Sequence, residues 1–95
     1  PIKEELNEAV SILSDEQKQL FRRIYQRIES GEGYVVPDDF VRDSSMHQNF
    51  RTLRNVNFIR PIQGGRWLPG LEVQVKNFGK LAAKMKNQEL GFSNL

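Results

Sequence analysis

The sequence has 95 residues, which is enough for one small domain and leaves no room for a second. It contains no cysteine, so disulfides, thiolate metal sites and cysteine nucleophiles are excluded, and no apolar run approaches the roughly 18–20 residues that span a membrane. We therefore expect a globular protein without membrane contact in a reducing compartment, cytoplasmic or, in a eukaryote, nuclear.

The formal net charge is only +2, but charge is divided unevenly along the chain. Residues 1–50 carry six basic and ten acidic side chains, a net charge of −4, whereas residues 51–95 carry eight basic and two acidic ones, a net charge of +6. Such a division is typical of a molecule with one end facing a polyanion or an acidic protein surface. It also arises by chance in small domains, where both halves are simply solvated.

Two amphipathic helices are predicted at the start of the chain. Apolar residues at helical spacing indicate a first helix over residues 1–13. Ser14 and Gln17 then have the spacing of a capping box, in which each side chain bonds the backbone N–H of the other residue. The second helix starts there, carries an apolar stripe, and ends where Gly31 supplies a left-handed residue just past its last turn.

Two further helices are predicted before the middle of the chain. Pro37 suits the first position of a short third helix, which should end near Asp43. Ser44 or Ser45 caps a fourth helix that runs to about Asn55. The buried face of the fourth helix is expected to consist of Met46, Phe50 and Leu53.

Extended segments are predicted around a glycine-containing turn. Residues 34–36 can pair at the edge of a small sheet. Residues 58–62 are extended, and residues 63–66 form a turn with two glycines that are free to adopt positive φ. A return strand begins at Trp67, is interrupted by a Pro-Gly pair, and resumes over residues 71–75.

A last amphipathic helix is predicted from about Asn77 to Lys86. Its inner face is expected to consist of Phe78, Leu81, Ala82 and Met85. Residues 87–95 follow as a flexible tail. The expected organisation is thus a single domain over residues 1–95, with a helical extension over 1–13, a core over 14–86 and the tail.

The order of elements over residues 14–86 resembles a winged helix-turn-helix domain. Residues 50–59 (FRTLRNVNFI) are similar to the end of a recognition helix, its turn and the first strand of the wing. Residues 73–81 (VQVKNFGKL) are similar to the second wing strand and the closing helix of MarR- and PadR-like repressors. The resemblance implies an α+β fold, mainly α, with an extra N-terminal helix and a two- to three-stranded antiparallel wing.

The sequence departs from the winged-helix pattern in three places. Asn57 stands where a glycine is usual before the wing, and it tolerates left-handed geometry reasonably well. Lys76 or Asn77 replaces the threonine that often precedes the closing helix. Residues 68–71 are an unusual interruption within the wing.

The resemblance implies binding of double-stranded DNA, with the fourth helix as recognition helix. Gln48 and Asn55 on its outward face suit adenine, and Arg51 suits guanine. Arg66 at the tip of the wing suits the minor groove or a phosphate. Further contacts to phosphates or base edges are expected from Ser44, Ser45, Thr52, Arg54 and Arg60. An ordinary solvated helix face would carry similar polar residues.

The charge near the predicted recognition helix limits its affinity for DNA. Arg51 is the only basic residue on its outward face, and Asp38, Asp39 and Asp43 precede the helix. One copy would supply about four or five phosphate contacts, where tight binders make roughly six to ten. We therefore expect a homodimer, or a fused or partner protein, in a small transcriptional regulator or the DNA-binding part of a larger protein.

Protein docking is the alternative function. Trp67 is expected to pack over the core, but a tryptophan beside Arg66 can also anchor a partner protein. The last helix is basic, so an acidic partner would be held by the wing and by Lys76, Lys80 and Lys84.

No catalytic, metal or cofactor site is predicted, and we expect the protein not to be an enzyme. His47 is the only histidine, so it cannot join a second His or a Cys in a zinc site. Ser44 and Ser45 lie next to it in sequence, but no carboxylate is set to orient its imidazole. The pair of residues 38–39, both aspartate, is explained as acids at a helix start rather than as catalytic carboxylates.

Overall fold

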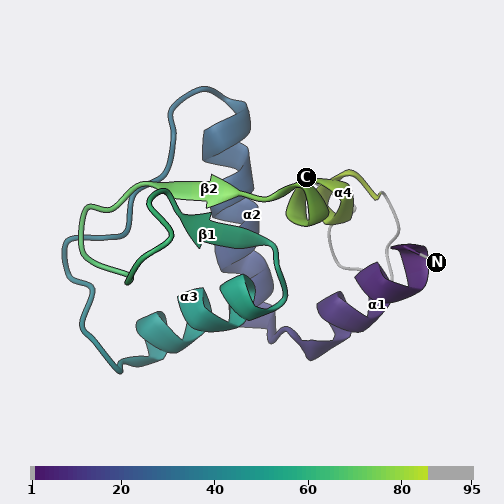
Figure 1. Cartoon of the computed structure of the whole chain (residues 1–95), viewed down its shortest axis with the longest axis horizontal. Coiled ribbons are helices and arrows are strands. Elements are labelled where there is room, and N and C mark those ends of the chain that lie inside the picture. Colours follow the sequence, from purple (N-terminus) through teal and green to yellow (C-terminus); the bar gives the residue numbers. More distant parts are fainter. Residues whose placement is uncertain (1, 86–95) are drawn as a thin grey trace.

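The computed structural model describes residues 2–85 as a mainly helical α+β fold (Figure 1). The described elements are, in chain order, α1 Ile2–Ile12, α2 Asp15–Glu29, α3 Ser45–Asn55, β1 Ile59–Pro61, β2 Val73–Val75 and α4 Asn77–Lys84. The two strands form an antiparallel sheet in which Arg60 lies opposite Gln74. The predicted α+β class with mainly helical content is confirmed. Lys86 and the predicted tail over 87–95 lie outside the described residues.

The core lies where α2, α3 and the sheet meet. Phe21 and Ile24 of α2, Phe50 of α3 and Phe58 before β1 have no exposed surface. The ring centroids of Phe21 and Phe58 are 4.9 Å apart, which joins α2 to the start of β1. In Figure 1, α1 and α4 lie at one end of the molecule, and the loop between β1 and β2 lies at the other. That loop and α3 form the end that carries the candidate site.

The predicted capping box at the start of α2 is confirmed. Gln17 N–H donates to the Ser14 hydroxyl at 3.1 Å, and Ser14 N–H donates to the Gln17 side-chain oxygen at 3.0 Å. The helix ends as predicted, because Gly31 adopts a left-handed φ of +85°. Both ends of α2 are therefore set by residues within four positions of its termini.

The predicted third helix from Pro37 to Asp43 is wrong, because turns occupy this segment. Phe40 N–H donates to the Pro37 carbonyl at 3.1 Å, and Ser44 N–H donates to the Val41 carbonyl at 3.2 Å. Asp43 has a left-handed φ of +63°, which ends any helix before it. The few residues available cannot offset the cost of nucleating a helix, so two turns bring Phe40 into the core instead.

The predicted fourth helix is confirmed as α3. Ser44 is its N-cap, and the Ser44 hydroxyl accepts from His47 N–H at 3.1 Å. Phe50 and Leu53 are fully buried. Past the end of the helix, Asn57 adopts a φ of +70°, the geometry for which a glycine is usual.

The hairpin after α3 is only partly as predicted. The strands lie within the two extended segments, and Val35 forms a single antiparallel bridge with Glu72. The strand predicted to begin at Trp67 is absent, since residues 66–68 make no strand pairing, and the Trp67 ring packs on Phe50 with centroids 5.1 Å apart. The interruption after it is a turn, in which Gly70 has φ +77° and its N–H donates to the Val36 carbonyl at 2.7 Å.

Helix α4 starts at Asn77 as predicted, and its predicted inner face is confirmed except for Leu81. Ala82 is buried and Phe78 and Met85 pack against the core, whereas Leu81 is 46% exposed. The helix approaches the chain before β1 on the side of Gly79, and Leu81, two positions later, lies on the opposite side. A Cβ added at Gly79 would lie 2.5 Å from the Phe58 carbonyl oxygen, so only glycine fits there.

Replacing Gly79 with alanine is expected to destabilise the protein by about 1–3 kcal/mol, because the added methyl group overlaps the Phe58 backbone. For a chain of this size, each kcal/mol lowers Tm by roughly 4–8 °C. Thermal unfolding followed by circular dichroism measures the change. Gly65→Ala is the control, since a Cβ there meets nothing within 4 Å. A Gly79→Ala protein that melts with the wild type would contradict the close approach.

Candidate nucleic-acid interface

The outward face of α3 carries the polar residues that the helical wheel predicts. Gln48, Arg51 and Asn55 are exposed, and Thr52 is half-buried. Gln48 donates to the Thr52 hydroxyl at 3.2 Å, so these two side chains are already partly paired. Arg51 therefore offers the only charged side chain on this face, as the sequence indicates.

The two predicted serine contacts lie at the start of α3. Ser45 is exposed, whereas Ser44 is half-buried. The hydroxyl oxygen of Ser44 accepts from His47 N–H and thereby caps the helix. Ser44 thus has a structural role, and Ser45 is the freer of the two hydroxyls.

A hollow of about 330 Å³ lies between α3, the turn before it and the hairpin loop. It is lined by Arg42, His47, Arg51, Arg54, Asn55, Gly65, Arg66 and Trp67. Four of the predicted contact residues thus meet in one place, from two segments of the chain. Among the described residues, the lining contains four arginines and no aspartate or glutamate. We call this site the arginine hollow.

Arg54 holds the hairpin loop in position against α3. Its two terminal guanidinium nitrogens donate to the carbonyl oxygens of Gly65 and Gly64, at 2.8 and 2.9 Å. Gly64 itself has φ +72° and its N–H donates to the Pro61 carbonyl at 2.9 Å, which closes the turn. Because two of its donors are used in this way, Arg54 contributes charge to the hollow and fixes the position of Arg66.

Three lining residues were missed by sequence reasoning as members of this site. Arg42 lies in the second of the two turns before α3, where a helix surface was expected. His47 was considered only as a metal ligand or a catalytic residue, and Trp67 was expected to pack over the core. Trp67 does so, since it is only 5% exposed, yet its edge also lines the hollow. No short-range sequence pattern indicates that these residues lie together, because their proximity depends on how the hairpin packs onto α3.

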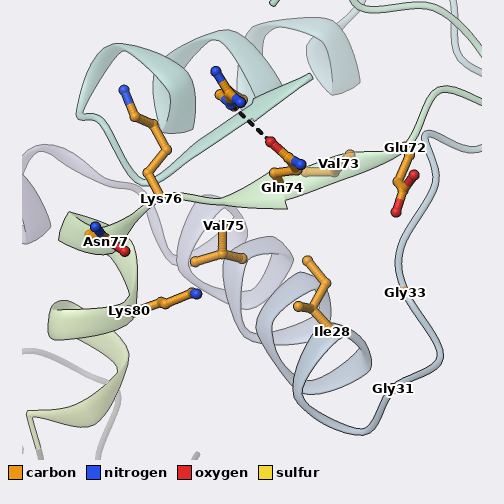
Figure 2. Close-up of a pocket in the computed structure, with 11 residues that line it drawn as sticks. Ile28, Gly31, Gly33, Glu72, Val73, Gln74, Val75, Lys76, Asn77 and Lys80 are labelled. Atoms are coloured by element: carbon orange, nitrogen blue, oxygen red, sulfur yellow. Dashed lines mark hydrogen bonds between the residues drawn. The ribbon is translucent and has the colours of Figure 1, made fainter. Parts of the chain in front are cut away.

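Arg60 lies apart from the arginine hollow. It projects from β1 and donates to the Gln74 side-chain oxygen at 2.9 Å across the sheet. It lines a second hollow of about 590 Å³ between α2, β2 and α4. Figure 2 shows this second hollow, in which the Lys80 side chain lies near Val75 of β2 and the Lys76 side chain points away from it.

The residues predicted for protein docking are divided between the two hollows. Lys76 and Lys80 line the second hollow, whereas Trp67 lines the arginine hollow. Lys84 is exposed on α4 and lines neither. Among the residues described, neither of these two hollows is lined by both Trp67 and the three lysines.

Comparison with known proteins identifies no relative: no family model, curated protein or solved structure matches the chain. Within residues 2–85, no three His, Cys, Asp or Glu side chains are grouped as a metal ion would require. No helix in that range is long and apolar enough to cross a membrane.

Replacing Arg54 with lysine is expected to loosen the hairpin loop, because one ammonium group cannot reproduce the two-point bond to Gly64 and Gly65. The free energy of unfolding should fall by about 1 kcal/mol. Hydrogen exchange of the Gly64 amide should accelerate while amides in α2 keep their protection, and NMR measures both. Arg60→Lys, which alters one exposed cross-strand bond, is the control. Unchanged exchange at Gly64 would show that Arg54 does not hold the loop.

Proposed function

We propose that the protein binds double-stranded DNA as a winged helix-turn-helix module, with α3 in the major groove and the hairpin loop on the backbone or in the minor groove. The observation that carries the proposal is the meeting of Arg51 and Asn55 of α3 with Arg66 of the hairpin loop around one cationic hollow. Phosphate contacts from two such segments would fix a recognition helix on the duplex.

The order of elements supports this proposal with one departure. A helix, a strand bridge at Val35, α3 and an antiparallel hairpin follow one another as in winged-helix domains. The helix that normally precedes the recognition helix is represented here by the turns over residues 37–44. Phe40 in those turns is buried and packs near Phe50, with centroids 6.1 Å apart, so the segment still supports α3.

The number of basic residues indicates modest affinity for a single copy. Arg42, Arg51 and Arg66 have no acidic neighbour in the lining of the hollow, and Arg54 adds charge beside them. About four phosphates would be neutralised in this way, fewer than a tight binder uses. We infer that useful affinity comes from a homodimer or from a fused or partner protein, as in a transcriptional regulator.

Docking of an acidic protein is a second candidate function, favoured by the second hollow. Both Lys76 and Lys80 line it, and the Lys80 side chain lies near the apolar side chain of Val75 (Figure 2). Basic groups at the rim of a partly apolar surface suit an acidic peptide. Trp67 is not part of this docking surface, because it lines the arginine hollow instead.

The DNA proposal predicts micromolar binding of random-sequence duplex that depends on the arginine hollow. For about four phosphate contacts, affinity should fall roughly a hundredfold between about 50 and about 200 mM salt. Arg51→Ala/Arg66→Ala should abolish most of the binding, because both guanidinium groups are lost. Fluorescence anisotropy of a labelled duplex measures the affinity of each protein.

The matched control is Lys80→Ala/Lys84→Ala, which changes the net charge equally but lies on α4. It should bind duplex DNA nearly as well as the wild type. Equal losses in the two double variants would reduce the interaction to net charge and contradict a defined interface. Absence of binding at low salt in a folded protein would refute the DNA proposal, and the second hollow would then be tested with an acidic peptide.

A further inference from the structure

Trp67 forms part of the wall of the arginine hollow. It is 5% exposed, and its indole Nε1 is buried without a hydrogen-bond partner among the residues described. The ring is held against Phe50, with centroids 5.1 Å apart. Trp67 therefore supplies a fixed aromatic wall close to the arginines.

His47 is a second ring in the same lining. Its Nδ1 accepts from the backbone N–H of Asp43 at 2.8 Å, which fixes the imidazole against the turn before α3. The Phe40 ring packs edge-on against the imidazole at 5.1 Å and restrains its orientation. His47 is thus held in one orientation within the lining.

Three arginines of the lining are free to bind an anion. Arg42, Arg51 and Arg66 form no hydrogen bond or ion pair with another described residue. Guanidinium groups bind phosphate and carboxylate oxygens in pairs, and they do so more strongly where no protein carboxylate competes. The described lining thus combines three uncommitted guanidinium groups with two rings that are fixed by their packing.

We propose that the arginine hollow binds a phosphomonoester, presented either by a free nucleoside monophosphate or by the 5′-phosphate of a DNA end. A phosphomonoester carries about 1.5–2 negative charges and three acceptor oxygens, which suits several converging donors better than the single charge of each backbone phosphate. The volume of about 330 Å³ lies within the range of small-molecule sites. This binding goes beyond the proposed duplex binding, since no duplex is required for it.

Deoxyadenosine 5′-monophosphate (dAMP) is the probe, with deoxyadenosine as the uncharged control. Calorimetric titration should show saturable binding of dAMP and none of deoxyadenosine. Trp67 is the only tryptophan in the chain, so its fluorescence should change with the same midpoint.

One variant and a matched control test the assigned arginines. Arg66→Gln, at an exposed position, should weaken dAMP binding about tenfold to a hundredfold. Lys80→Gln, in the second hollow, should bind dAMP like the wild type. A folded Arg66→Gln protein with wild-type affinity for dAMP would overturn the proposal.

Duplexes of one sequence with 5′-phosphate or 5′-hydroxyl ends distinguish the two sources of the phosphomonoester. Tighter binding of the phosphorylated duplex, lost in Arg66→Gln, supports the proposal and identifies a DNA end as a ligand. If neither dAMP nor the 5′-phosphate binds better than its unphosphorylated counterpart, the proposal is overturned even when duplex binding persists. Binding of dAMP by a protein without affinity for duplex supports the phosphomonoester site and refutes the DNA function instead.

Discussion

The burial of Phe50 is the interaction on which the candidate site depends. Its ring lies 5.1 Å from Trp67, 6.1 Å from Phe40 and 6.5 Å from Tyr34, measured between centroids. These neighbours belong to the hairpin loop, the turns before α3 and the segment that bridges to Glu72. None of the three lies in a helix, so few backbone ladder bonds hold them. Aromatic contacts, each worth about 0.5–1.5 kcal/mol beyond burial, hold the walls of the arginine hollow around α3.

Helix α3 holds the hairpin loop at two points. Inside the protein, Phe50 packs on Trp67, and at the surface Arg54 donates to two carbonyls of the glycine turn. The surface contact brings a fixed positive charge close to Arg51 and Arg66. Like charges held together repel each other, which disfavours this arrangement unless an anion is bound. The net charge of +2 does not indicate this local concentration of positive charge. Most acidic residues lie in the first half of the chain, and none lines the described part of the hollow.

Features set by near neighbours in sequence could be predicted. The capping box of α2, the Ser44 cap of α3 and the left-handed Asn57 each depend on partners within a few positions. The polar face of α3 follows from helical geometry, so Arg51 and Asn55 were identified without a structure.

Features set by packing across the chain could not be predicted in the same way. The turns at residues 37–44 form because Phe40 must reach the core from a short segment, although Pro37 favours a helix start. Leu81 of α4 is exposed because the helix approaches Phe58 on the side of Gly79, which no periodicity in the sequence of the helix indicates. Arg42 and Trp67 could not be predicted to line one hollow, because they lie far apart in sequence. Only the packing of the turns and of the hairpin loop on α3 brings them together.

The two proposed uses of the arginine hollow make different demands on the same guanidinium groups. In groove binding, each arginine neutralises a separate backbone phosphate, and the salt dependence grows with each one. In the proposed phosphomonoester site, Arg42, Arg51 and Arg66 would bind a single phosphate, so fewer counterions would be released for the same number of basic residues. The salt dependence of binding therefore separates the two uses. Both depend on Arg54, because it fixes the loop that carries Arg66 against α3.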